Sequence, residues 1–228
     1  MGKYLTPVAV ILGAVVIGGA VIWSGGTRGT NPNDPNAAPT VNIEDVATDT
    51  SPTVGDPGAP TTVAVYYDYQ CPFCKQFELA VIPQLMENYV TTGKTKIIYK
   101  DFHFLGEDSM TAAVFGRALY DLYPDQFQAW FIAMANAQDE EGDEGFGDLA
   151  SIQELTRGIG GIDVDRVTAQ MEEKRSEYEA AIQADYDEGT RFGINGTPSI
   201  IVGDQLLTGM APEQFYQAIA AELDEQLQ

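Results

Sequence analysis

The residues 61–99, which hold the chain's only two cysteines, restrict the possible folds more than any other segment. The run Thr61–Tyr67 is β-branched and aromatic and follows a Gly-Asp-Pro-Gly turn, so it predicts a buried strand. Apolar residues then recur at helical spacing over Cys71–Val90, with a kink expected at Pro83. The run Thr95–Tyr99 predicts a second strand. A strand, a helix and a strand in succession imply a parallel pair with a right-handed crossover.

The second half of the folded part adds helices first and strands later. Amphipathic helical patterns occupy about 107–187 and are interrupted near the middle by Gly142–Gly147. Two short strands, Ser199–Val202 and Gln205–Thr208, flank a Gly-Asp turn, and a closing helix follows from Ala211. The order βαβ, helical block, ββα predicts an α/β domain over 61–228, with one sheet flanked by helices and a helical insertion.

An uncharged apolar run, Leu5–Trp23, precedes this domain. Its residues would span about 28 Å as a helix, close to the hydrocarbon thickness of a bilayer. We therefore expect a transmembrane anchor at 5–23. Lys3 in the N-terminal flank predicts that residues 1–4 are cytoplasmic and the bulk of the chain is outside. The alternative is a signal peptide cleaved after Ala20, which would leave an apolar start to the mature chain.

Residues 24–60 are rich in Gly, Thr, Asn, Asp and Pro and show no lasting period. This composition predicts a flexible extracytoplasmic linker that confines the domain to the membrane surface. The piece Asn42–Val46 is a candidate for a short ordered stretch within it.

The formal net charge of −22 excludes whole classes of partner. Nucleic acids and anionic lipid surfaces both require a basic face, so neither is an expected ligand. The densest acidic run lies over residues 139–148. We interpret it as a solvated face, with salt adaptation or a divalent-cation site as the alternatives.

Two cysteines and one histidine do not suffice for a disulfide scaffold or a structural zinc site. We therefore expect no metal. The histidine, His103, is predicted to have a structural or surface role. Lys100 and Asp101, which follow the second predicted strand, are expected in a loop.

The position of the cysteine pair indicates thiol chemistry. Cys71 stands at the start of a helix, where unpaired N–H groups and the helix dipole favour a thiolate. Pro72 suits the first helical turn, and Cys74 lies one turn further on, close enough to form a small disulfide ring. We expect an exposed, nucleophilic Cys71 and a more buried, resolving Cys74. The alternatives are an inert structural disulfide or the remnant of a metal site.

Two motifs resemble the DsbA-type branch of the thioredoxin superfamily. They are Asp68–Cys74 (DYQCPFC), continuing into Lys-Gln-Phe-Glu, and Gly196–Ser199 (GTPS). The resemblance covers about residues 55–228. It implies a thioredoxin-like fold and a redox-active Cys71–Cys74 disulfide with no other cofactor. It also implies a cis bond before Pro198, with the backbone around Thr197 pairing with an extended substrate segment beside Pro72 and Phe73.

Two departures from the family pattern leave the reaction direction open. Many relatives carry a buried acid six residues before the first cysteine, where this chain has Val65. Phe73 replaces the histidine of the most oxidising relatives, so it supplies no hydrogen bond to the thiolate.

These features together predict an oxidase at the outer face of the cell membrane. It would introduce disulfides into unfolded exported proteins and be reoxidised by a membrane quinone-linked thiol oxidase. The alternative within the class is a disulfide reductase or isomerase. The alternative from another class is a tethered peptide-binding holdase without redox chemistry.

Overall fold

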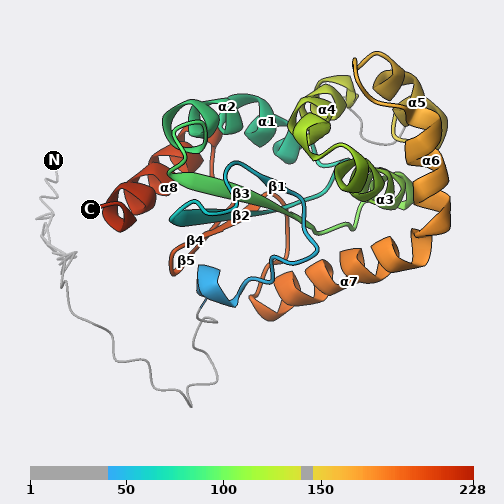
Figure 1. The fold of residues 1–228 in the computed structure, drawn as a ribbon. Coiled ribbons are helices and arrows are strands. Elements are labelled where there is room, and N and C mark those ends of the chain that lie inside the picture. Colours follow the sequence, from blue (N-terminus) through green and yellow to red (C-terminus); the bar gives the residue numbers. More distant parts are fainter. Residues whose placement is uncertain (1–40, 140–145) are drawn as a thin grey trace, which may run out of the picture. The chain divides into compact units, whose positions relative to one another are not determined.

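The structure, a computed structural model, describes residues 41–139 and 146–228. Its sheet has the order β1-β3-β2-β4-β5 (Figure 1). The bounds are Thr53–Val54 for β1, Thr61–Tyr67 for β2, Thr95–Asp101 for β3, Ser199–Val202 for β4 and Gln205–Thr208 for β5. Strands β2 and β3 are parallel, with Val65 opposite Tyr99, and the other pairs are antiparallel. The predicted parallel pair and C-terminal hairpin are therefore confirmed.

The helix predicted after the first cysteine is present but divided. It consists of α1 (Pro72–Ala80), α2 (Ile82–Leu85) and a π-helical turn, η2 (Met86–Val90). Pro83 stands in the first turn of α2, where its missing N–H costs no hydrogen bond. The expected kink is thus a break at Val81.

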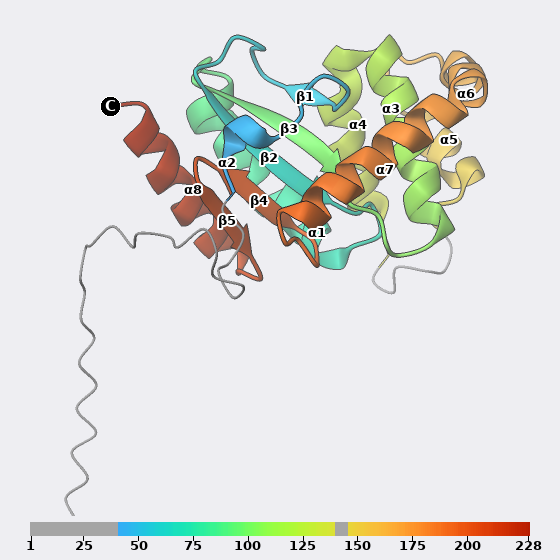
Figure 2. The ribbon, with the colours of Figure 1, turned by 90° about the horizontal axis from the view of Figure 1, so that it is seen from below.

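The predicted helical insertion lies between β3 and β4. It comprises α3 (Glu107–Leu122), α4 (Pro124–Ala137), α5 (Leu149–Arg157), α6 (Val164–Glu173) and α7 (Arg175–Arg191). The expected central break falls between α4 and α5. Figures 1 and 2 show α3–α6 grouped beyond one end of the sheet, with α7 returning toward it. The closing helix is α8 (Pro212–Gln226).

Strand β2 divides the apolar core into two clusters. Val63, Val65 and Tyr67 belong to the larger cluster with residues of α1, α3, α4 and α8. Ala64 and Tyr66 belong to a smaller cluster. Because successive side chains of a strand point to opposite faces, a strand buried on both faces is apolar throughout. This explains the continuous apolar run in β2.

The domain begins earlier than predicted, so the expected linker over 24–60 is wrong for its described part. Val41 and Val46 are buried in the smaller cluster, around a short 3₁₀ helix, η1 (Ile43–Asp45). Strand β1 then adds an edge to the sheet. The ordered piece expected at Asn42–Val46 is confirmed.

The membrane anchor predicted at 5–23, and linker residues 24–40, lie outside the described residues. Within 41–139 and 146–228, no helix is both long and apolar enough to cross a bilayer.

Candidate functional site

The cysteine pair lies at the start of α1, just after the turn that follows β2. Cys71 is the N-cap residue, with extended φ and ψ of −78° and 118°, and Pro72 is the first residue of the helix. The backbone N–H of Cys71 donates to the Asp68 carbonyl at 3.1 Å, which shapes the turn between strand and helix. The predicted placement of the pair at a helix start is therefore confirmed.

Both cysteines are buried, which corrects the expectation of an exposed Cys71. Their exposed fractions are 4% for Cys71 and 8% for Cys74. The loop before β4 covers the first sulfur, since Cys71 Sγ donates to the Thr197 carbonyl at 3.3 Å. The Thr197–Pro198 bond is cis, as expected. The fold thus brings two motifs that are 126 residues apart into direct contact.

The two thiols have opposite acidities. A hydrogen bond from the Cys74 thiol lowers the pKa of Cys71 to about 6, although burial of Cys71 opposes this shift. The Thr197 side chain and the backbone N–H groups of Cys74 and Phe73 add to the lowering. Burial raises the pKa of Cys74 well above its ordinary value. The Thr197 hydroxyl has no hydrogen-bond partner among the described residues, so it remains available to sulfur. These shifts favour the thiolate form of Cys71 and the thiol form of Cys74 near neutral pH.

Four large exposed apolar side chains, two on α1 and two on the loop after β3, form what we call the apolar rim. Phe73 is 64% exposed and Phe104 is 49% exposed, and Leu79 and Leu105 are also exposed. A groove of about 530 Å³ lies alongside α1. It is lined by Pro72, Lys75, Gln76, Leu79, Ala80, Asp139 and Pro212. Large exposed apolar side chains beside a reactive thiol suit contact with unfolded polypeptide.

Asp68 organises the loops around the pair. Its carboxylate accepts hydrogen bonds from the backbone N–H groups of Gln70, Phe104 and Leu105 at 2.8, 2.8 and 3.1 Å, and from the Ser109 hydroxyl at 2.5 Å. The active-site turn and the loop that carries Phe104 are therefore held by one side chain.

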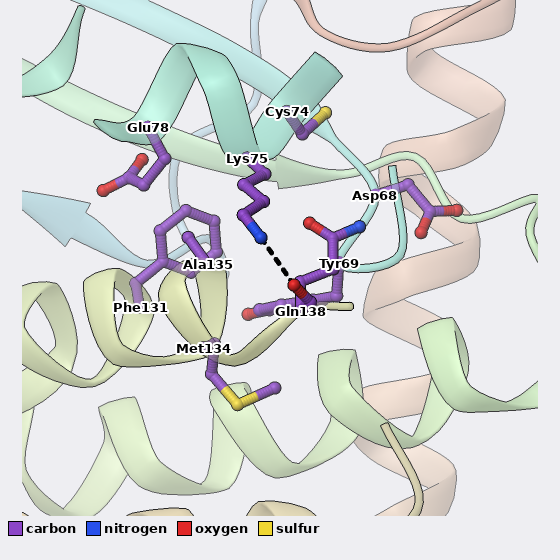
Figure 3. Close-up of a pocket in the computed structure, with 9 residues that line it drawn as sticks. All are labelled: Asp68, Tyr69, Cys74, Lys75, Glu78, Phe131, Met134, Ala135 and Gln138. Carbon is purple, nitrogen blue, oxygen red and sulfur yellow. Dashed lines mark hydrogen bonds between the residues drawn. The ribbon is translucent and has the colours of Figure 1, made fainter. Parts of the chain in front are cut away.

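A small cavity lies between α1 and α4 behind the cysteines (Figure 3). It is lined by Asp68, Tyr69, Cys74, Lys75, Glu78, Phe131, Met134, Ala135 and Gln138. Glu78 is 2% exposed, and burial raises its pKa to about 8. Sequence reasoning missed Glu78. The signal that could have identified it is its position four residues after Cys74, on the helix face that faces the core.

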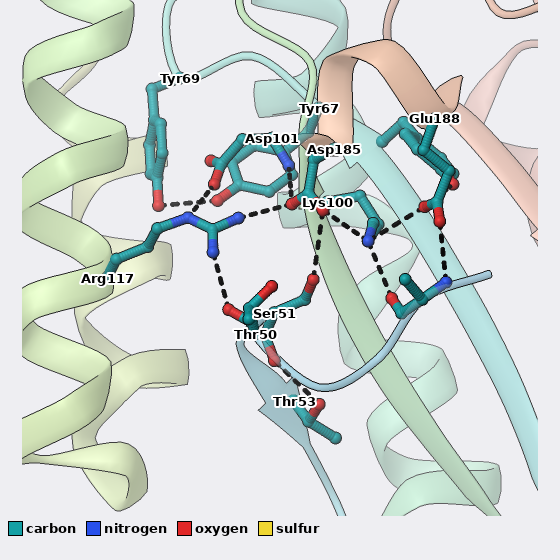
Figure 4. A network of polar contacts seen from close by, with 12 residues as sticks. Thr50, Ser51, Thr53, Tyr67, Tyr69, Lys100, Asp101, Arg117, Asp185 and Glu188 are labelled. Carbon is teal, nitrogen blue, oxygen red and sulfur yellow. Dashed lines mark hydrogen bonds and ion pairs between the residues drawn. The ribbon is translucent and has the colours of Figure 1, made fainter. Parts of the chain in front are cut away.

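A second polar cluster is buried between β3, α3 and α7 (Figure 4). Lys100 Nζ lies 2.5 Å from Asp185 and 3.0 Å from Glu188. Arg117 contacts Asp101 at 2.7 Å and Asp185 at 2.5 Å. The prediction that Lys100 and Asp101 lie in a loop is wrong, because they are the last two residues of β3. Their charges are tolerated in a strand because partners from the insertion neutralise them.

His103 takes no part in the cysteine site in any contact that the structure records. Its ring lies 5.6 Å from that of Tyr186, and its Nδ1 is buried without a partner among the described residues. The described residues also hold no group of three or more His, Cys, Asp or Glu side chains able to bind a metal ion.

The fold and the cysteine pair define a class: the chain is a thiol–disulfide oxidoreductase of the DsbA type. The sequence profile of the family described as thioredoxin matches residues 47–221. The chain therefore belongs to the thioredoxin family.

Similar proteins carry names from the same chemistry. A "probable disulfide bond formation protein D" of Bacillus anthracis is 26% identical over 157 residues, which are 69% of this chain and 71% of that protein. The oxidised BdbD structure from Bacillus subtilis has a TM-score of 0.71 at 21% identity, covering 83% and 100% of the two chains. The thiol-disulfide exchange protein alpha-DsbA2 from Wolbachia pipientis has a TM-score of 0.65 at 26% identity, covering 78% and 89%.

Proposed function

We propose that this oxidoreductase introduces disulfides into exported proteins. The observation that carries the proposal is the acidity of Cys71, whose pKa is lowered to about 6. Hydrogen bonds that stabilise the Cys71 thiolate stabilise the reduced protein, and a stable reduced form makes the disulfide a stronger oxidant. The name "disulfide bond formation protein D" of the Bacillus relatives supports the same direction.

In the proposed reaction, a substrate thiolate attacks Cys71 of the Cys71–Cys74 disulfide. The bond between the two cysteines breaks, Cys74 leaves with the electron pair, and a mixed disulfide joins Cys71 to the substrate. A second substrate thiolate then attacks the substrate sulfur of that bond. Cys71 leaves as its stabilised thiolate, and the substrate is oxidised by two electrons.

Two parts of the site have supporting roles in this proposal. An extended substrate segment pairs with the backbone around Thr197 and the cis bond at Pro198, as an added strand. Pro72 and Phe73, with the apolar rim, contact the substrate side chains around its cysteine. The protein that receives the disulfide is therefore an unfolded or reduced protein. The redox group is the Cys71–Cys74 disulfide itself, without another cofactor.

Two sequence features support the proposed location and recycling partner. With Leu5–Trp23 as an anchor, the domain works outside the cell membrane, where disulfides persist. A separate membrane quinone-linked thiol oxidase accepts the electrons, since this chain holds no further cysteines.

Thiol trapping in cells tests the direction. We expect an oxidised Cys71–Cys74 pair at steady state, and a mostly reduced pair would instead support the reductase or isomerase alternative. With purified protein, Cys71→Ala should abolish oxidation of a reduced model protein. In a Cys74→Ala variant, the Cys71 thiolate should instead attack a disulfide of an oxidised model protein, displace one of its sulfurs as a thiolate and hold the protein as a mixed disulfide. If the double Cys→Ser variant retains full function in cells, the holdase alternative is supported.

A further inference from the structure

Asn195 is the only asparagine of the chain that is followed by glycine. In an Asn-Gly pair, the backbone nitrogen of the glycine can attack the carboxamide carbon of the asparagine and close a five-membered ring, a succinimide. Glycine favours this step, because it has no Cβ to hinder its nitrogen and lets the backbone bend. The pair directly precedes Thr197, whose carbonyl accepts a hydrogen bond from Cys71 Sγ at 3.3 Å. A reaction at this pair would therefore take place beside the thiol site.

The surroundings of the pair leave both reacting groups free. Asn195 is exposed, and its side chain makes no hydrogen bond to any residue that the structure describes. The backbone N–H of Gly196 likewise has no acceptor in the described part of the chain. A Cβ built on Gly196 would meet no heavy atom within 4 Å, so the loop has room to bend here. Water can reach the pair, and ammonia can leave it.

The other asparagines within 41–139 and 146–228 are held in place. Asn42 accepts a hydrogen bond from the Glu44 N–H at 2.9 Å and caps η1. Asn88 and Asn136 lie inside η2 and α4, where each amide donates to the carbonyl four residues earlier at 2.9 Å. None of the three precedes a glycine. They are internal controls, because they carry the same side chain without the reactive neighbour.

The loop that carries the pair connects α7 to β4 and is fixed at both ends, so its main-chain length matters (Figure 2). Ile194 is buried, and its N–H donates to the Gly189 carbonyl at 2.9 Å. On the other side, the Ser199 hydroxyl donates to the Gly196 carbonyl at 2.7 Å. One extra main-chain atom in between would add about 1.5 Å of chain. The added length would shift Thr197 away from its position.

We infer that Asn195 modifies itself to aspartate and isoaspartate, and that isoaspartate lowers the exchange activity of the protein as it ages. The Gly196 nitrogen loses its proton and bonds to Cγ of Asn195, whose bond to Nδ2 breaks, and ammonia leaves. Water then opens the succinimide at one of its two carbonyl carbons. Opening at Cγ gives aspartate. Opening at the main-chain carbon gives isoaspartate, in which the chain runs through Cβ and Cγ and is one atom longer. Water is the only co-reactant, and no electrons are transferred.

Isoaspartate at residue 195 should affect the thiol site in two ways. The longer main chain displaces the Thr197 carbonyl from Cys71, and the new carboxylate disfavours the Cys71 thiolate by its like charge. Aspartate brings the charge alone, and water and salt screen it because residue 195 is exposed. The longer loop is therefore the main cause of the expected loss. This loss rests on the proposed function, through the pairing of substrate with the backbone around Thr197, whereas the modification itself does not.

The test follows the modification and the activity in one incubation. The oxidised full chain is held at physiological temperature and neutral pH for several weeks. Trypsin then releases residues 192–228 as one peptide, in which Asn195 is the only asparagine. Mass spectrometry detects the exchange of amide for acid, and methylation by an isoaspartyl methyltransferase measures isoaspartate. We expect most copies of this peptide to be modified, while the peptides with Asn88 and Asn136 keep their amides. The rate should rise about tenfold per pH unit, because the attacking nitrogen must lose a proton.

Two variants stop the chemistry with little change in the loop. Gly196→Ala adds a Cβ that has room, at a φ outside the left-handed region. Its modification should be at least about tenfold slower, because the Cβ restricts the approach of the nitrogen. Asn195→Gln keeps an exposed amide but requires a six-membered ring, so it should be similarly slow. Oxidation of a reduced model protein by each aged sample is compared with that by its own fresh sample. Both variants should keep their activity, while the wild type loses it in proportion to its isoaspartate.

Fresh Asn195→Asp separates charge from chain length. Its activity should lie within about twofold of the fresh wild type, since the exposed charge is screened. If the folded chain keeps its Asn195 amide under conditions in which the urea-unfolded chain loses it, the inference is wrong. Modified protein that is as active as fresh protein would refute the effect on exchange. Absence of oxidation by the fresh wild type would instead contradict the proposed function, and the isoaspartate content would still decide whether the modification occurs.

Discussion

Arg117 Nη2 and Asp185 Oδ2 lie 2.5 Å apart in a buried ion pair that joins α3 to α7. The same guanidinium contacts Asp101 on β3, and Lys100 reaches the other oxygen of Asp185. Burial raises the pKa of Asp185 even though both cations oppose that shift. The cluster thus fixes the helical insertion to the sheet, and its charges depend on one another for neutralisation.

Removing Arg117 should leave Asp101 without a cation and Asp185 with Lys100 alone. We expect Arg117→Met to lower the free energy of unfolding by about 3–5 kcal/mol, because two carboxylates stay buried without their guanidinium. Urea denaturation followed by circular dichroism measures this. The control is Arg157→Met, which removes an exposed pair with Glu154 and should change stability by less than about 1 kcal/mol. A similarly small loss in Arg117→Met would contradict the structural role of the cluster.

The segment before β2 should be essential to the domain. Lys100 Nζ donates to the Ala47 carbonyl at 2.8 Å, and Arg117 donates to the Thr50 carbonyl at 2.7 Å. A chain that starts at residue 55 loses both acceptors, at about 1.5–3 kcal/mol each, along with β1. We expect it to unfold at a lower urea concentration than a chain that starts at residue 41. Equal midpoints would show that residues 41–54 act only as a linker.

The acidity of Cys71 should depend on its neighbour. The hydrogen bond from the Cys74 thiol is the largest influence that lowers the pKa of Cys71 to about 6. In Cys74→Ala, this pKa should rise toward the ordinary value for a thiol, while the N–H groups of the helix start keep part of the shift. Thiolate absorbance near 240 nm as a function of pH reports it. An unchanged midpoint would mean that the helix start alone sets the acidity.

Asp68 should affect stability and substrate contact together. An amide offers one oxygen, whereas the carboxylate accepts four hydrogen bonds with two, so Asp68→Asn should cost about 1–3 kcal/mol of unfolding free energy. Because the Phe104 loop is loosened, we also expect a higher KM for a reduced model protein with a smaller change in kcat. Ser109→Ala, which removes one of the four donors, should show a weaker form of both effects. Unaltered KM and stability in Asp68→Asn would be inconsistent with this role.

Glu78 should make stability decrease as pH rises. Its pKa is about 8 in the folded protein, whereas the ordinary value of 4.5 applies to the unfolded chain. The folded chain therefore binds this proton more tightly than the unfolded chain. The contribution is complete below pH 4.5 and is lost as pH rises through about 8. The difference in unfolding free energy between the wild type and Glu78→Gln should therefore shift in favour of the variant over this range. A difference that does not vary with pH would show that Glu78 titrates normally.

The elements with strong local periodicity were predictable, and those supported by distant contacts were not. The strand Thr61–Tyr67 has the predicted bounds because its apolar run matches burial on both faces of the sheet. The last two residues of β3, Lys100 and Asp101, were expected in a loop because charged side chains rarely lie in a buried strand. Only their partners on α3 and α7 make that position favourable. The same holds for β1, a two-residue strand with no periodicity to detect.

The sequence by itself determined the chemistry of this protein: a thiol pair at a helix start after a buried strand, and a Gly-Thr-Pro turn that resembles the family's second motif. These are local features, since spacing, helix position and proline geometry act over a few residues. The tertiary structure decided how that chemistry is tuned. The Thr197 carbonyl over Cys71, the saturation of Asp68 and the cavity shared by Cys74 and Glu78 all depend on contacts between segments far apart in the chain. Burial and hydrogen bonding, which set acidity, exist only once those segments meet.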